Sequence, residues 1–96
     1  MDKLTSTIQR EWLKEIVAGR KTVEYREIKP YWTKRLAEVS PPFFLRLING
    51  MSTNAPEVTV QIDRVRTNLG SGNYELHIGK VVEVRNWDRA GERPNA

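Results

Sequence analysis

The 96-residue sequence predicts a single-domain α+β fold, in which about five strands form a small β-barrel or curled sheet beside an N-terminal helix and a second short helix. Two observations predict this fold. Apolar residues recur at helical spacing only near the N-terminus, whereas apolar and polar residues alternate over long runs after residue 43. These long runs contain bends and leave few residues to cover both faces of a sheet, which favours a sheet that curls on itself.

The first predicted helix begins at residue 6 or 7 and ends at Gly19. The segment 6–9, Ser-Thr-Ile-Gln, has the form of a capping box at a helix start. Glycine at position 19 is a typical residue just beyond a helix end. Between these signals the apolar residues share one helical face: Ile8, Trp12, Leu13, Ile16 and Val17.

Residues 22–26 then predict a short strand in which alternate side chains share a face. Glu24 and Arg26 lie on one face, while Val23 and Tyr25 lie on the other, which we expect to pack in the core. Pro30 begins the second helix, from residue 31 to about 38, because proline is tolerated in a first helical turn. Its predicted inward residues are Trp32 and Leu36, and the Ser-Pro-Pro segment at 40–42 ends it.

The rest of the chain predicts strands. Residues 43–48 are nearly all apolar, and residues 49–56 form a turn or loop. The alternation that begins at Val58 slips by one residue at Arg64, which indicates a β-bulge. Residues 68–73 predict a hairpin loop, and Gly79 within the last strand predicts a bend or a close backbone approach. The single domain therefore spans 1–88, and the polar residues 89–96 predict a flexible C-terminal tail.

Composition limits the classes of function. The chain has 39% hydrophobic and 29% charged residues, with no apolar run near the ~20 residues that a membrane span needs. The polar N-terminus is unlike a signal peptide, and the lack of cysteine fits a reducing compartment, so we expect a cytoplasmic protein without membrane contact. A net charge of +4 and a pI near 9.7 favour anionic partners. With one histidine and no ligand spacing, we expect no metal and no cofactor.

The most informative segment is 19–26, with the pattern G-x-K-x-x-E-x-R at Gly19, Lys21, Glu24 and Arg26. It places two cations and a carboxylate between the first helix and the first strand. Lys21 could contact a phosphate or polarise a carbonyl, and the nearby carboxylate favours this electrostatic role over that of a base. Glu24 could orient the Arg26 fork toward a phosphate or a base edge. Alternatively, the two form a structural ion pair that closes the barrel mouth.

This order of elements, with G-x-K-x-x-E-x-R at the helix-to-strand junction, resembles the ASCH domain of the PUA-like superfamily over residues 5–87. The resemblance implies a PUA-like barrel with an RNA- or nucleotide-binding cleft between the first helix, the motif strand and the barrel. Some small members hydrolyse the amide of acetylated cytidine, and others are ribonucleases. In the amidohydrolases the motif lysine is joined by a threonine and a downstream glutamate. Lys21 matches the lysine, but Glu24 occupies the threonine position and no matching glutamate is recognisable.

We therefore expect a binding module for RNA or a modified nucleotide, with a nucleic-acid-related hydrolase using Lys21 and Glu24 as the alternative and a protein-interaction adaptor as a third hypothesis. Rings and cations also interleave in the second helix, a combination that suits stacked bases and a phosphate backbone. His77 alternates with its apolar neighbours, so it points away from their face and is either a ligand contact or structural. The further predicted ligand-binding residues are Tyr31, Lys34, Arg35 and His77. Neither the ligand nor the oligomeric state follows from the sequence.

Overall fold

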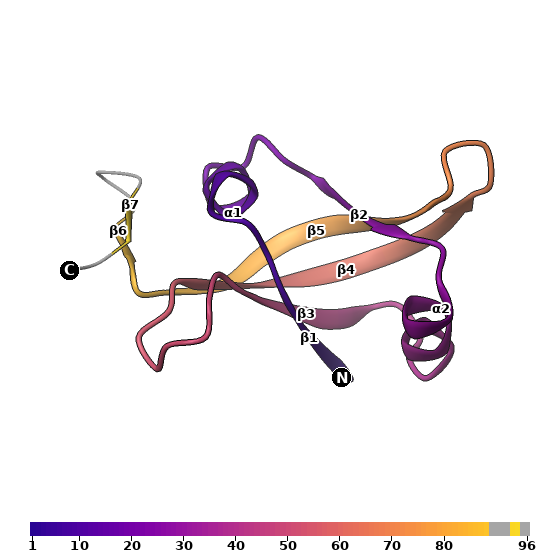
Figure 1. The fold of residues 1–96 in the computed structure, drawn as a ribbon, viewed down its shortest axis with the longest axis horizontal. Helices are drawn as coiled ribbons and strands as arrows, with labels where there is room; N and C mark the ends of the chain where they lie inside the picture. The colour runs from indigo at the N-terminus through magenta and orange to yellow at the C-terminus, as the bar shows by residue number, and fades with distance from the viewer. Residues whose placement is uncertain (89–92, 95–96) are drawn as a thin grey trace.

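The computed structural model describes residues 1–88 and 93–94 and contains a five-stranded mixed sheet that curls into a half-barrel beside two helices (Figure 1). This confirms the predicted α+β fold with a curled sheet. The sheet order is β1-β3-β4-β5-β2, so β1 and β2 are its two edges. The strands are β1 (Lys3–Thr7), β2 (Val23–Glu27), β3 (Phe43–Ile48), β4 (Glu57–Asn68) and β5 (Asn73–Arg85), and the helices are α1 (Arg10–Val17) and α2 (Pro30–Ala37).

The N-terminal prediction is wrong in one respect, because residues 3–7 form β1 and the helix begins only at Arg10. β1 pairs in parallel with β3, with Leu4 opposite Leu45, and Gln9 precedes α1 without a side-chain capping bond. Leu4 and Ile8 are both buried. Burying two such side chains contributes about 1.5–3 kcal/mol each, which exceeds the ~1 kcal/mol of one helix cap. The segment therefore pairs as a strand.

The end of α1 is as predicted. Gly19 has a φ of 80°, and its N–H donates to the Ile16 carbonyl oxygen at 3.0 Å. The N–H of Arg20 donates to the Glu15 carbonyl oxygen, also at 3.0 Å, which completes a Schellman motif. Glycine suits this position because its φ is in the left-handed region. This turn sends the chain directly into the motif segment and β2.

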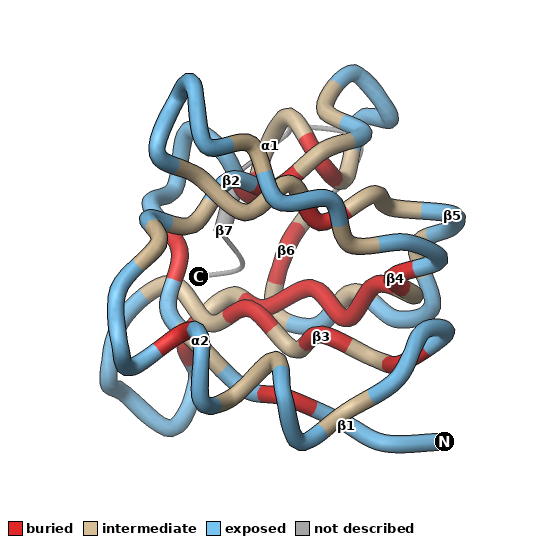
Figure 2. Tube along the Cα trace, turned by 90° about the vertical axis from the view of Figure 1, so that its right-hand side faces the viewer, coloured by how far each residue is buried: buried red, intermediate tan, exposed pale blue. Residues whose placement is uncertain are grey.

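The core fills the concave face of the sheet. Figure 2 shows buried residues concentrated along β3 and β4, where the antiparallel register places Leu45 opposite Val60. Leu13 and Ile16 of α1 and Trp32 of α2 join this core. The second helix begins at Pro30 as predicted, with Trp32 buried. The fully buried sheet residues are Phe43, Leu45, Leu47, Val58, Val60, Ile62 and Leu76.

The β4–β5 hairpin bends where the sequence predicts a bulge. Ile62 lies opposite Ile78 and Arg64 lies opposite His77, so Asp63 is an extra residue on β4. At Gly79, where the sequence predicts a bend or a close backbone approach, the close neighbour is a side chain, because a Cβ built there would overlap the Asp63 carboxylate. Bulges increase the local twist of a strand pair. The hairpin thereby curls the sheet, and both of its strands contact α1.

Beyond the main sheet, β6 (Trp87–Asp88) pairs with β7 (Arg93–Pro94). Most of the predicted tail 89–96 lies outside the described residues. Neither described helix has the length and apolar character needed to cross a membrane. The two edge strands β1 and β2 leave one side of the half-barrel open, and the candidate site lies on this side.

Candidate binding cleft

A cleft of about 850 Å³ lies on the open side of the half-barrel. One wall comes from residues 7–9 and Trp12, where β1 leads into α1. The opposite wall comes from Lys21 and the motif strand, and the start of α2 contributes Lys29 and Trp32. The cleft therefore lies between the first helix, the motif strand and the end of β1. Its volume falls within the range of small-molecule sites, about 300–1,000 Å³.

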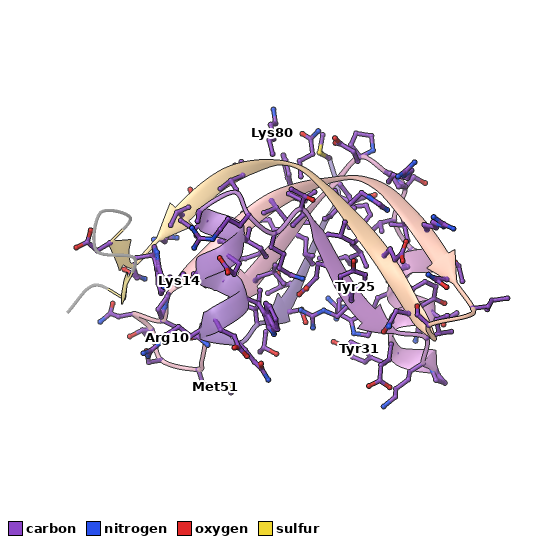
Figure 3. All side chains as sticks on the ribbon, turned by 90° about the horizontal axis from the view of Figure 1, so that it is seen from above. Arg10, Lys14, Tyr25, Tyr31, Met51 and Lys80 are labelled. Carbon is purple, nitrogen blue, oxygen red and sulfur yellow. The ribbon has the colours of Figure 1, made fainter. Side chains whose placement is uncertain are left out.

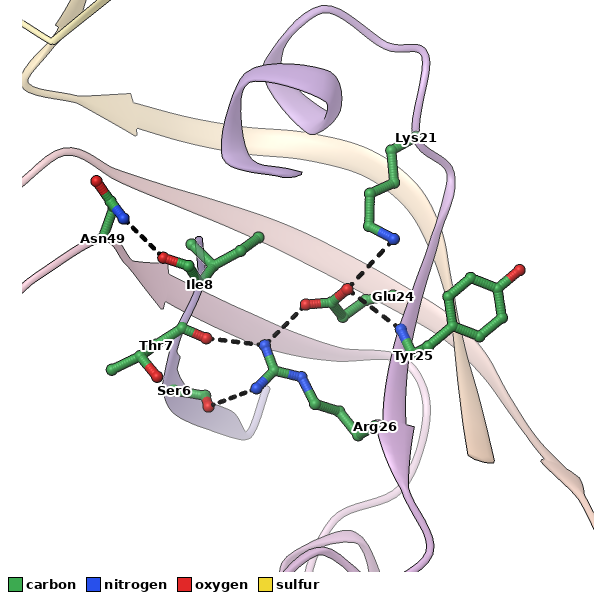
Figure 4. Close-up of polar contacts among 8 residues, drawn as sticks. All are labelled: Ser6, Thr7, Ile8, Lys21, Glu24, Tyr25, Arg26 and Asn49. Carbon is green, nitrogen blue, oxygen red and sulfur yellow. Dashed lines mark hydrogen bonds and ion pairs between the residues drawn. The ribbon is translucent and has the colours of Figure 1, made fainter. Parts of the chain in front are cut away.

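The carboxylate of Glu24 is the centre of the cleft floor. Its side chain is only 8% exposed, because Glu24 lies opposite the buried Leu76 and faces the concave side. Lys21 Nζ lies 3.4 Å from Oε1, and Arg26 Nη2 donates to Oε2 at 2.7 Å (Figure 4). The backbone N–H of Tyr25 donates to Oε1 at 3.2 Å. Three donors thus compensate the burial of this charge, and the three charged motif residues do converge.

The guanidinium of Arg26 spans the open side of the half-barrel. Its Nη2 donates to the Thr7 carbonyl oxygen at 2.8 Å, and its Nη1 donates to Ser6 Oγ at 3.2 Å. Its Cζ also lies 5.1 Å from the centre of the Trp32 ring. These contacts join β2 to β1, which are the two edge strands of the sheet and do not pair with each other. The geometry supports a structural role for Arg26, closing the mouth as the ion-pair alternative describes.

Lys21 has a different environment. Its Nζ lies 5.3 Å from the centre of the Trp12 ring and 5.0 Å from that of Tyr25, both within cation–π range. The lysine side chain is 14% exposed, whereas Trp12 and Tyr25 are 46% and 51% exposed. The ammonium is therefore held between two rings that remain open to the cleft.

The exposure of Tyr25 corrects the prediction that it packs in the core. The side chains alternate as expected, but the inward face of the strand is the one that carries Glu24 and Arg26, not the one that carries Tyr25. Glu24 and Arg26 point to the concave side, where they form hydrogen bonds. Trp12 was likewise expected on the buried helix face; Leu13 and Ile16 are buried there as predicted, but Trp12 is half exposed. An aromatic residue at the border of an apolar helical face, next to a charged motif, was the available signal for a cleft residue.

The second helix brings its predicted site residues near the cleft but not into its lining. Arg35 Nη1 donates to Tyr31 Oη at 2.9 Å, and Arg35 Nη2 donates to the Thr5 carbonyl oxygen at 2.9 Å. Arg35 therefore forms a second tie to β1, beside the one made by Arg26. Lys34 is exposed on the same helix and does not line the cleft.

His77 lies away from the cleft. The register places it opposite Val23 and Arg64, on the face of the sheet that Glu24 does not share. Its Nε2 is 4.0 Å from Glu75 Oε1. Among residues 1–88, no three His, Asp or Glu side chains are grouped so as to hold a metal ion.

Asn49, which follows β3, is a cleft residue that the sequence gave no reason to select. Its Nδ2 donates to the Ile8 carbonyl oxygen at 2.9 Å, across 41 positions of sequence (Figure 4). Only the parallel pairing of β1 with β3 brings the two together. The side-chain amide thereby stands at the cleft wall, where its kind of group can both donate and accept hydrogen bonds.

The charges of the cleft are largely paired. Lys21 and Arg26 share Glu24, and Lys29 Nζ lies 3.2 Å from Glu27 Oε2. The lining therefore combines three cations with two carboxylates, a small positive excess. Chemically, it offers rings for stacking, an ammonium donor between them and an amide at the wall. Neither a scan against models of known protein families nor a search of curated proteins returns a match for this chain.

Proposed function

We propose that this chain is an ASCH-like, PUA-like module that binds RNA or a modified nucleotide in the 850 Å³ cleft. The observation that carries the proposal is the placement of Lys21 Nζ between the half-exposed rings of Trp12 and Tyr25. A planar base can stack on either ring, and such stacking is worth about 1–3 kcal/mol per base. The ammonium between the rings then donates to an acceptor on the base or the phosphate.

The floor of the cleft supports binding over hydrolysis. The Glu24 carboxylate accepts hydrogen bonds from Arg26 and the Tyr25 backbone N–H and forms an ion pair with Lys21, which suits a residue that positions its neighbours. Lys21 Nζ in turn lies 3.4 Å from this carboxylate and forms an ion pair with it. Charge-based recognition of a ligand is therefore the role we assign to Lys21.

Binding is tested with cytidine monophosphate and a short single-stranded RNA, measured by calorimetry and by tryptophan fluorescence at low salt. Trp12→Ala is expected to weaken binding by roughly tenfold, since one stacking surface is lost. Lys21→Ala is expected to weaken it as well. Lys80→Ala is the matched control, because Lys80 is an exposed lysine of β5 that does not line the cleft. Figure 3 shows Lys80 on the opposite side of the sheet from Tyr31.

Because most cleft cations are paired, the RNA affinity should depend only moderately on salt. Two phosphate contacts would reduce it by about sevenfold between 50 and 200 mM salt. Absence of binding by both ligands at low salt would overturn the proposal, as would equal effects of Trp12→Ala and Lys80→Ala. Turnover of acetylcytidine or RNA that is lost in Lys21→Ala would instead establish the hydrolase alternative.

A further inference from the structure

A second, smaller hollow of about 330 Å³ shares a wall with the cleft. Trp12, Lys21 and Tyr25 line both hollows. On the far side of this wall the second hollow is lined by the end of α1 and the turn into β2, including Arg20 and Thr22. The aromatic pair therefore separates two adjoining spaces rather than closing a single one.

We infer that the second hollow is a subsite for the nucleotide adjacent to the one in the cleft, so that the ligand is a single strand of at least two nucleotides. The inference rests on the proposed function. Lys21 Nζ lies over one face of each ring, 5.3 Å from the centre of Trp12 and 5.0 Å from that of Tyr25, so the pair offers two further ring surfaces, one for each of two bases. Trp12 and Tyr25 are each about half exposed, and both line both hollows.

The cations at the dividing wall fit the phosphate that links two nucleotides. Lys21 is common to both hollows, and Arg20 lines only the second. The Arg20 side chain is 54% exposed, and its Nε contacts Glu15 Oε2 at 2.5 Å. Glu15 thus orients a guanidinium whose planar, multiple-donor shape suits phosphate. The Gly19 turn fixes this arginine immediately after α1, next to Lys21 in sequence and in space.

The size of the second hollow fits one further ligand unit and no more. Its 330 Å³ is at the lower end of the range of small-molecule sites, whereas the cleft is near the upper end. Val23 adds a half-buried apolar surface to it, and Thr22 adds an exposed hydroxyl. An apolar contact, a hydroxyl and a cation suit a base, a ribose and a phosphate.

The test compares cytidine monophosphate with the dinucleotide CpC, using calorimetry at low salt. The wild-type protein should bind CpC roughly tenfold more tightly than the mononucleotide, as expected for one additional stacked base. Arg20→Ala and Thr22→Glu should each remove most of this difference while leaving the affinity for the mononucleotide within about twofold. Thr22→Glu places a carboxylate in the second hollow. The substitution keeps the bond that the Ile78 N–H donates to residue 22, because the acceptor is the backbone carbonyl oxygen of Thr22. Lys80→Ala again serves as the control.

The possible failures are distinct. If the mononucleotide binds and CpC binds no more tightly, the second subsite is overturned while the proposed function stands. Equal losses for both ligands in Arg20→Ala and in Thr22→Glu would also overturn it, because the two residues would then act on the cleft itself. If neither ligand binds the wild-type protein, the proposed function falls and the subsite with it.

Discussion

Arg26 Nη2 donates a 2.8 Å hydrogen bond to the carbonyl oxygen of Thr7, which joins the two opposite edges of one five-stranded sheet. The same nitrogen donates to Glu24, so a single guanidinium both holds the cleft floor and closes the open side of the half-barrel. The cleft is therefore built on an interaction that also stabilises the fold.

Substitution of Glu24 should destabilise the protein, because Lys21 and Arg26 lose their shared counter-charge. Removing one partner of a fully buried ion pair costs ~3–5 kcal/mol. Since Lys21 and Arg26 retain 14% and 18% exposure, we expect Glu24→Gln to lower the free energy of unfolding by about 2 kcal/mol. Urea denaturation measures this loss.

The matched control for that variant is Glu27→Gln on the same strand. Glu27 pairs with Lys29 at the surface, where both side chains are about two-thirds exposed. Such pairs contribute about 0–1 kcal/mol. Equal losses of stability in the two variants would show that Glu24 does not compensate its neighbours.

Loss of Arg26 should loosen the attachment of β1 to the rest of the half-barrel. In Arg26→Ala, the bonds to Thr7 and Ser6 disappear, and β1 keeps its pairing with β3 and the bond from Arg35 to the Thr5 carbonyl oxygen. Hydrogen exchange should then accelerate at the Ile8 amide, which donates to the Ile48 carbonyl oxygen, by more than it does in β4 and β5. Arg64→Ala, at an exposed β4 position, should leave the Ile8 amide unchanged. Uniform acceleration across all strands would contradict a tie specific to β1.

Glu57 should make stability depend on pH in the acid range. Arg46 Nε and Nη2 donate to its two carboxylate oxygens at 2.9 and 2.8 Å, and this hydrogen bonding lowers the pKa of Glu57 below its ordinary value of 4.5. A carboxyl with a lowered folded-state pKa stabilises the protein above its unfolded-state pKa. That contribution is lost as the pH falls through the lowered folded-state value.

The comparison of wild type with Glu57→Gln isolates this contribution. The difference in unfolding free energy between the two should be larger at pH 7 than at pH 3, because pH 3 lies below the ordinary pKa of 4.5, where the unfolded wild-type chain takes up a proton that the ion pair with Arg46 opposes in the folded state. Urea unfolding at both pH values measures it. A difference that is independent of pH would mean that the ion pair with Arg46 does not stabilise the folded state.

Gly79→Ala should destabilise the hairpin through a contact with one side chain. The added Cβ would lie 1.9 Å from Asp63 Oδ2, so Asp63 must move and give up the 2.8 Å bond that it accepts from Gln61. We expect a cost of about 1 kcal/mol, the typical value of such a bond. The double variant with Asp63→Ala should recover this cost, because the clashing atoms are absent. A full double-mutant cycle by chemical denaturation checks the coupling, and additive losses would refute it.

Local signals in the sequence predicted much of the fold. Gly19 ends the first helix because its position has a positive φ, and Pro30 begins the second because its fixed φ suits a first turn. The strand at 43–48 follows from its nearly continuous apolar run, the hairpin loop from its two glycines, and the bulge before Arg64 from a slip in the alternation of period two. The motif itself was also readable, since Lys21, Glu24 and Arg26 are close in sequence.

Only the tertiary structure decided which face of β2 turns inward and which residues complete the cleft. Alternation places Glu24 and Tyr25 on opposite faces but does not say which face is inside; the Arg26 bonds to Ser6 and Thr7 put the charged face there. The first strand was missed because it pairs with β3, and this pairing joins residues about 40 positions apart. Helix caps and turns depend on residues that are neighbours in the sequence. The pairing of edge strands, the burial of Glu24 and the position of Asn49 at the cleft depend instead on contacts that exist only once the sheet has curled.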